Sequence, residues 1–247
     1  MHKFKTLGLV LIITFLLFSS SLKADTTSQL LDKSALDHAW RKGEYQNLSF
    51  MQKNLTGEFT EGGSSTNPRI FQEIDVLHYT IDAHFYPGTS YPDNSYLTAS
   101  STIEAKAKSV MLNQVIIDFY DNITITAFRL NGLDFSSYTR SNNKIWMNLS
   151  SDPLEPGEEF EITIDYTHVY GSISQGLMFS KHGSNNTPAI CSIDQPYESP
   201  GWWPCFDYPS DKATGDIYIT CPDWMIGVSN GLLQPGYPIN NFDGTKT

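Results

Sequence analysis

The sequence predicts an all-β fold, either an antiparallel β-sandwich or an open, saddle-like sheet. Apolar and polar residues alternate through most of the chain from Ile74 onward, and turn-forming pairs of Asn, Gly and Pro separate the alternating runs. Alternation with a period of two places one face of a strand in a core and the other face in water. The roughly 170 residues from Ile74 to Thr247 are enough to bury a single core.

The first predicted strand begins at about Ile74 and buries its odd-numbered residues from Leu77 to Phe85. Further strands are predicted over 97–107, 115–120, 123–130, 144–149, 160–166 and 214–221. Turns are predicted between them at Asn131-Gly132, Asn142-Asn143 and Pro156-Gly157. The last residues, 243–247, are typical of a turn that leads into one more strand.

Residues 1–24 have the pattern of a secretory signal, so we expect an exported protein, either secreted or periplasmic. Lys3 and Lys5 precede an apolar run from Leu7 to Phe18, and small residues lead to a cleavage site after Ala24. The apolar run is too short for a comfortable membrane span, and no later stretch reaches the ~18 apolar residues of a spanning helix. We therefore expect no membrane span after signal cleavage.

Residues 25–73 are predicted to be a leader that precedes the β-domain of residues 74–247. Within the leader, Gln29 to Tyr45 has the apolar spacing of a short helix. Gly57 to Pro68 is rich in Gly, Ser and Thr, which is typical of a flexible linker.

The chain is acidic, with a net charge of −11. Cleavage of the signal would remove Lys3, Lys5 and Lys23 and change the net charge to −14. It has no run of Lys or Arg, which argues against nucleic acid as a partner. The spacing of its three cysteines is compatible with one disulfide and one free thiol, and equally with no disulfide. No cysteine pair has C-x-x-C spacing, so the sequence predicts no cysteine metal site.

A proline-stiffened, aromatic stretch from Cys191 to Gly231 dominates the second half of the chain. Its prolines exclude a regular helix or a central strand, and its aromatic side chains predict a large loop packed against the domain. The stretch contains, in order, Gln195-Pro196-Tyr197, Trp202-Trp203-Pro204-Cys205-Phe206-Asp207, Pro209, Lys212-Ala213-Thr214 and Ser229-Asn230-Gly231.

This order of residues resembles the end of the amino-terminal β-domain of the aminopeptidase N family of zinc metallopeptidases, the gluzincins. The resemblance extends back to Ile74, where DVLHYTIDAHF is similar to the first strand of that domain. It implies zinc in the full-length enzyme and a peptide amino terminus as the substrate group. Gly176 to Ser180 is similar to a Gly-Leu-Tyr strand of the same domain.

The catalytic motifs of that family are absent from the sequence, so we expect no catalytic residue, metal ligand or bound cofactor in this chain. Its six histidines include no H-E-x-x-H pair, in which two histidines one helical turn apart bind zinc beside a glutamate base. The family's G-x-M-E-N segment is also missing. His78 and His84 share the polar face of one predicted strand, as a metal pair or as two solvated side chains.

One substrate-binding residue follows from the resemblance. The family places a Glu or Gln nine residues before the Pro of the Pro-Cys-Phe-Asp motif, where it binds the α-ammonium of the substrate, and this position is Gln195. A glutamine accepts a hydrogen bond through its amide oxygen but forms no ion pair. The family often has a basic residue before the aromatic pair, whereas this chain has Ser199-Pro200-Gly201.

The leading interpretation is therefore the amino-terminal domain of an exported zinc aminopeptidase, cut off before its catalytic domain, which caps the active site and is inactive alone. The first alternative is a stand-alone secreted β-module that binds a peptide or protein and catalyses nothing. A second alternative is a carbohydrate-binding sandwich with Trp202 and Trp203 as its platform. The resemblance instead predicts that both tryptophans, with Phe206, pack the loop against the sheet or against the next domain.

Overall fold

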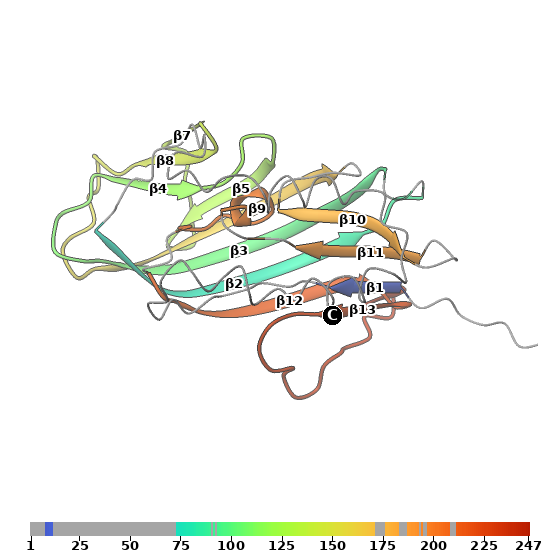
Figure 1. Cartoon of the computed structure of the whole chain (residues 1–247). Helices are drawn as coiled ribbons and strands as arrows, with labels where there is room; N and C mark the ends of the chain where they lie inside the picture. Colours follow the sequence, from blue (N-terminus) through green and yellow to red (C-terminus); the bar gives the residue numbers. More distant parts are fainter. Residues whose placement is uncertain are drawn as a thin grey trace, which may run out of the picture.

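The computed structural model describes residues 8–11, 73–89, 91, 93–170, 176–182, 187–192, 194, 197–207 and 211–247. These residues form β-strands and one short 3-10 turn, Ser199–Gly201 (Figure 1). The all-β fold predicted from the alternating pattern is confirmed. No helix in the described ranges is long and apolar enough to cross a membrane.

The strands of the described residues form three sheets. The largest contains, in spatial order, β14 (Thr245–Lys246), β12 (Thr214–Pro222), β2 (Ile74–Tyr86), β3 (Ser95–Ala107), β9 (Glu159–Tyr170), β5 (Thr124–Leu130) and β6 (Leu133–Asp134). A three-stranded sheet contains β4 (Gln114–Asp118), β8 (Lys144–Asn148) and β7 (Tyr138–Ser141). A four-stranded sheet contains β10 (Leu177–His182), β11 (Thr187–Ser192), β1 (Gly8–Leu11) and β13 (Met225–Val228).

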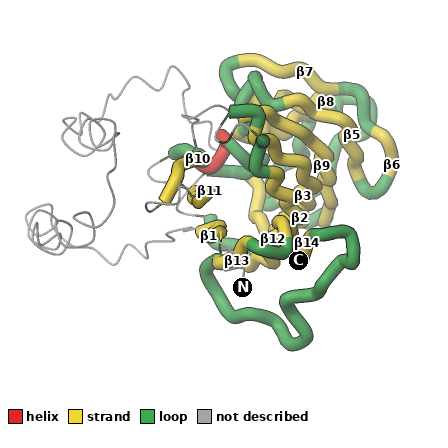
Figure 2. The backbone as a smooth tube through the Cα atoms, turned by 90° about the vertical axis from the view of Figure 1, so that its right-hand side faces the viewer, coloured by secondary structure: helices red, strands yellow, loops and turns green. Residues whose placement is uncertain are grey.

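The long strands β2, β3 and β9 run antiparallel to one another and form the middle of the largest sheet. Strand β12 pairs parallel with β2, with Ile217 opposite Ile81, although more than a hundred residues separate them in the chain (Figure 1). Figure 2 shows β10, β11, β1 and β13 as a separate row beside the row of the largest sheet.

A single hydrophobic core joins the three sheets. Its fully buried members include Ile103 of β3, Ile164 of β9, Met147 of β8 and Met225 of β13. The opposite face of the largest sheet carries polar side chains, as the alternating pattern predicts. The core therefore lies on one side of the long strands.

The predicted burial of Leu77 is wrong. The pairing of β2 with β3 shifts register between Val76 and His78, and Leu77 is 38% exposed. A β-bulge adds one unpaired residue, so the inward face changes from even to odd numbers at this point. Ile74 and Val76 are buried before the bulge, and Ile81 is buried after it.

The turns predicted after β5, after β7 and between β8 and β9 are confirmed by their backbone angles. Asn131 and Gly132 have φ values of 50° and 77°, and Asn142 and Asn143 have values of 54° and 56°. Two successive positive φ values define the tight hairpin turn whose twist matches that of the flanking strands. Gly157 also has a positive φ, 86°.

The amino-terminal predictions are mostly outside the described residues. This holds for the predicted helix from Gln29 to Tyr45 and for the predicted linker from Gly57 to Pro68. Strand β1 is described, and it lies inside the predicted export signal, where its backbone pairs parallel with both β11 and β13. Cleavage after Ala24 would remove this strand from between its two neighbours.

Candidate functional site

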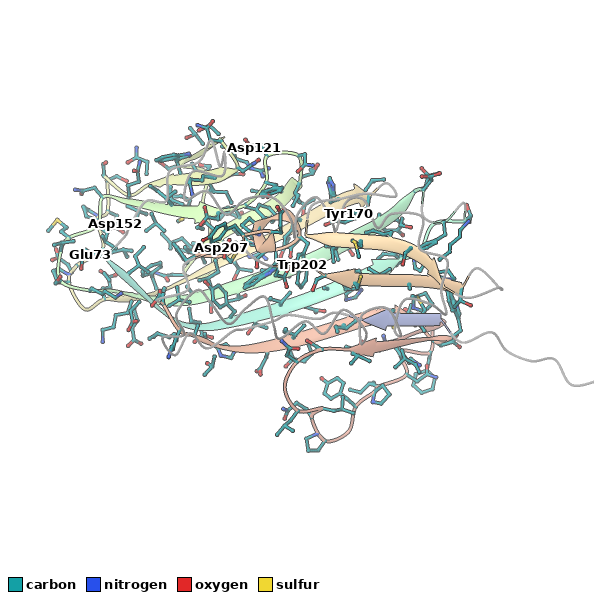
Figure 3. All side chains as sticks on the ribbon, viewed as in Figure 1. Glu73, Asp121, Asp152, Tyr170, Trp202 and Asp207 are labelled. Atoms are coloured by element: carbon teal, nitrogen blue, oxygen red, sulfur yellow. The ribbon has the colours of Figure 1, made fainter. Side chains whose placement is uncertain are left out.

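The aromatic loop, defined here as residues 197–207, connects β11 to β12 and crosses the end of the core. Trp202 and Cys205 are buried, with Trp202 1% exposed, whereas Tyr197 at the start of the loop is exposed; Figure 3 labels Trp202. Trp203 meets the ring of Tyr79 edge-on, with 5.0 Å between ring centroids. The prediction that these aromatics pack the loop against the sheet is confirmed.

Trp202 fixes the chain just before Gln195. Its Nε1–H donates to Oδ1 of Asp194 at 2.7 Å, and the Ser192 hydroxyl donates to Oδ2 of the same carboxylate at 3.2 Å. Asp194 is only 8% exposed. A buried carboxylate needs such donors, since an unsatisfied one would be costly. The indole and the carboxylate therefore hold each other in place.

The far end of the loop is held by Asp118 at the end of β4. The backbones of Asp118 and Cys205 exchange two hydrogen bonds, of 2.9 and 3.1 Å. The Asp118 carboxylate accepts the Asp207 N–H at 3.2 Å and forms an ion pair with Lys144, a residue only 4% exposed. The Lys144 side chain is 5% exposed and the Asp118 side chain 22% exposed. Removing either charge would therefore leave the other without its partner in a largely desolvated position.

Glu198 carries the half-buried carboxyl of the loop. Its carboxylate accepts a hydrogen bond of 3.1 Å from the Tyr120 hydroxyl, and its N–H donates to the Asp194 carbonyl at 3.0 Å. Burial raises the pKa of the Glu198 carboxyl, and the Tyr120 hydrogen bond opposes that shift. Burial also raises the pKa of the Tyr120 hydroxyl, and the Glu198 charge adds to that shift.

All three cysteines are free thiols, which decides between the alternatives that the sequence leaves open. Burial raises the pKa of the Cys191 thiol to about 11 and that of the Cys205 thiol well above its usual range. Because the thiolate is the nucleophile, neither side chain is suited to nucleophilic chemistry in the folded protein.

Gln195, the substrate-binding residue implied by the resemblance, lies outside the described residues, so its assignment stays a prediction. The structure does describe Asp194 before it and Tyr197 after it. Sequence reasoning did not identify the residues that hold this segment, which are Asp118, Tyr120, Lys144, Asp194 and Glu198. Asp118, Tyr120 and Lys144 come from a distant part of the chain, and the Asp194–Trp202 contact depends on how the loop folds back, so no local pattern indicates them.

The histidines of β2 do not come together as a metal pair. The His78 ring lies 2.7 Å from the Thr214 hydroxyl and 3.7 Å from Asp216, whereas the His84 ring lies 3.3 Å from Asp82. Within the described residues, no group of three or more His, Cys, Asp or Glu side chains could hold a metal ion. The carbohydrate platform of Trp202 and Trp203 is excluded, because the first is buried and the second packs on Tyr79.

Comparison with known proteins agrees with this fold and loop. The model of the Peptidase M1 N-terminal domain matches residues 76–241. The match covers well over half of the chain, and the chain therefore belongs to the Peptidase M1 N-terminal domain family. The resemblance drawn from the aromatic loop is thus confirmed. None of the curated proteins compared with the sequence matches it.

Two solved structures show the same fold. One is a mutant M1 zinc metallopeptidase from Deinococcus radiodurans bound to a Tyr-Ser-Ala substrate, with a TM-score of 0.55 and 23% identity over 70% of this chain. The other is a mutant two-domain M1 zinc metallopeptidase bound to L-arginine, with a TM-score of 0.54 and 24% identity over 70% of this chain. The chain spans 38% of the length of each.

Proposed function

We propose that this chain is the amino-terminal domain of an exported zinc aminopeptidase, where it caps the active site and helps to hold the α-amine of a peptide substrate. Membership of the Peptidase M1 N-terminal domain family supports the aminopeptidase assignment. A solved structure with this fold is a metallopeptidase bound to a Tyr-Ser-Ala substrate, which supports a peptide ligand.

The observation that carries the proposal is the rigid support of the chain on both sides of Gln195. Trp202 holds Asp194 through a buried hydrogen bond of 2.7 Å, and Tyr120 holds Glu198 through one of 3.1 Å. A group that orients a substrate needs its neighbours fixed by packing and hydrogen bonds. In the proposal, the Gln195 amide oxygen accepts a hydrogen bond from the substrate ammonium.

Zinc is the metal that the relatives contain, and the described residues of this chain do not fit a zinc site. His78 and His84 each pair with separate polar neighbours, and no third ligand joins either one. In the proposal, the zinc is bound by an H-E-x-x-H motif in further polypeptide of the enzyme, because the given sequence contains no such motif. This chain would contribute substrate binding and shape.

An exposed apolar patch supports contact with further polypeptide. We define the patch as Leu232, Leu233, Ile239 and Phe242, in the loop between β13 and β14; Leu232 is 89% and Phe242 95% exposed. Exposed apolar side chains gathered in one segment indicate an interaction surface. At the base of this loop, Ile239 exchanges two backbone hydrogen bonds with Thr247, of 2.8 and 3.0 Å.

The decisive test is the reading frame beyond codon 247. An in-frame H-E-x-x-H is expected, and the longer product should release amino acids from an aminoacyl anilide in a chelator-sensitive reaction. The present chain alone should show no such activity. In the longer product, Gln195→Ala should raise KM for the anilide, whereas Gln195→Glu should lower it by adding an ion pair with the ammonium. The matched control Gln234→Ala, in the exposed loop, should leave KM unchanged.

Two results would overturn the proposal. One is a stop codon directly after Thr247, and the other is chelator-sensitive activity in the present chain. The first result would favour the alternative of a secreted, non-catalytic β-module, for which the apolar patch would be the surface that meets a protein partner. Export is tested separately, by determining the amino terminus of the secreted or periplasmic protein, which should be Asp25.

A further inference from the structure

The polar face of the largest sheet, as formed by the described residues, contains a shallow hollow that the proposed peptidase function does not use. The hollow has a volume of about 390 Å³ and crosses four adjacent strands. Its polar lining includes Asp82 and His84 of β2, Thr98 and Ser100 of β3, Asp165 and Thr167 of β9, and Thr126 of β5. The core lies on the opposite face of these strands, so the lining side chains point away from it.

The charged side chains that line the hollow already have polar neighbours. Asp165 accepts hydrogen bonds of 2.7 Å from both Arg129 and Ser100, and Asp82 lies 3.3 Å from the His84 ring. A cationic ligand would have to compete with Arg129 for Asp165, and an anionic ligand would meet the carboxylates of Asp82 and Asp165. A neutral ligand with many hydroxyl groups could instead add hydrogen bonds to the fixed donors and acceptors.

An aromatic pair lies next to the hollow, one same-face position further along β2 and β3. Tyr86 and Tyr96 come two residues from His84 and Thr98 on the same strands, so they lie on the same face of the sheet. Their rings are stacked, with centroids 4.3 Å apart and planes 10° from parallel, and Tyr96 is 39% exposed. An exposed tyrosine in this position offers an apolar ring face together with a polar tip.

We propose that this hollow binds a neutral saccharide, with one sugar ring packed on the Tyr86–Tyr96 pair and its hydroxyl groups hydrogen-bonded to Ser100, Asp165 and the neighbouring threonines. A site of this type combines an aromatic surface with a few convergent polar groups. Because the hollow is open along the sheet, it suits an extended glycan better than a single enclosed sugar. It would attach the exported domain to a polysaccharide without involving the aromatic loop.

The test is calorimetric titration of the full chain with cellohexaose, maltohexaose, xylohexaose and mannohexaose, and with polygalacturonate as an acidic counterpart. At least one neutral oligosaccharide should bind, and Tyr96→Ala should weaken that binding by about tenfold. Ser100→Ala should weaken it by a smaller factor. The control Leu133→Ala, at the exposed strand β6 of the same sheet, should leave it unchanged. Thermal unfolding of each variant separates loss of binding from loss of fold.

Three results would overturn the proposal. They are the absence of binding by every neutral oligosaccharide, binding that Tyr96→Ala and Ser100→Ala leave unchanged, and binding of polygalacturonate alone. If Tyr96→Ala does not fold, Tyr96→Leu and Ser100→Ala replace it as tests of saccharide binding. The leucine keeps apolar volume but removes the aromatic ring, so binding that neither variant weakens would overturn the proposal.

Discussion

Trp202 is the residue on which the position of the aromatic loop most depends. It is 1% exposed, and its indole N–H donates to the Asp194 carboxylate, to which the Ser192 hydroxyl also donates. We expect Trp202→Phe to lower the free energy of unfolding by about 1–3 kcal/mol, because it leaves a buried carboxylate without its best donor. Urea denaturation of the variant and the wild type measures this loss.

Trp146→Phe is the matched control. The Trp146 indole also donates to one acceptor, the Ser141 carbonyl at 3.2 Å, but it does so at an exposed site. Water can replace that donor, so we expect a loss below about 0.5 kcal/mol. Equal losses of unfolding free energy in the two variants would show that the buried Trp202–Asp194 hydrogen bond stabilises the fold no more than the exposed one.

The Glu198 carboxyl should make stability depend on pH. Its pKa is raised in the folded state by burial, so over the pH range between its ordinary pKa and its raised one the folded state holds this proton more tightly than the unfolded state does. The stability contributed by the protonated carboxyl is complete below the ordinary pKa and decreases as pH rises through this range. We expect Glu198→Gln to remove this decrease.

The measurement is the difference in unfolding free energy between the wild type and Glu198→Gln across the mildly acidic range. The stability of the wild type should decrease relative to that of the variant as pH rises. A difference that stays flat would contradict the raised pKa. A difference with the opposite slope would indicate that the Tyr120 hydrogen bond outweighs burial.

At the scale of elements, the ion pair between Asp118 and Lys144 joins the aromatic loop to the three-stranded sheet. Asp118 ends β4 and Lys144 begins β8, so the pair fixes the loop to two strands at once. We expect Lys144→Ala to lower the unfolding free energy by about 1–3 kcal/mol, because it leaves the half-buried Asp118 carboxylate without its counter-ion. Guanidinium denaturation measures the loss.

Lys106→Ala provides the comparison on the largest sheet. Lys106 pairs with Glu159 at 3.7 Å, with side chains 42% and 67% exposed. Exposed ion pairs contribute little, so we expect a loss below about 1 kcal/mol. If Lys106→Ala destabilised the chain as much as Lys144→Ala does, burial would not be the cause of the larger effect.

At the scale of the whole molecule, the acidic surface and the apolar patch have opposing effects on solubility. Net charge keeps copies apart, whereas the exposed Leu232, Leu233 and Phe242 side chains favour association. We expect the isolated chain to self-associate as its concentration rises. Replacing these three residues with serine should make it monomeric in sedimentation velocity.

Leu133→Ser is the control for the apolar patch, because Leu133 is 75% exposed and lies on β6 at the opposite edge of the largest sheet. This change should leave self-association as it is in the wild type. A wild-type chain that stays monomeric at all concentrations would contradict the role assigned to the patch.

The sequence by itself determined the long strands, the turns and the family of this protein, whereas β6, β7, β11 and β13 carried no pattern that predicted them. A strand can be predicted from the alternation of apolar and polar residues within its own segment. The Asn131-Gly132 turn can be predicted because both residue types tolerate a positive φ. The aromatic loop was likewise recognisable from its own residues. Gln195 and export remain predictions, since the structure does not describe the first and no finding tests the second.

Only the tertiary structure decided which strands are neighbours and which polar groups meet. The parallel pairing of β12 with β2, the ion pair of Asp118 with Lys144 and the bond between Trp202 and Asp194 join segments by packing. The exposure of Leu77 follows from a bulge against β3. Alternation tells which face of a strand is buried but not what it is buried against, because pairing depends on the energy of the whole core.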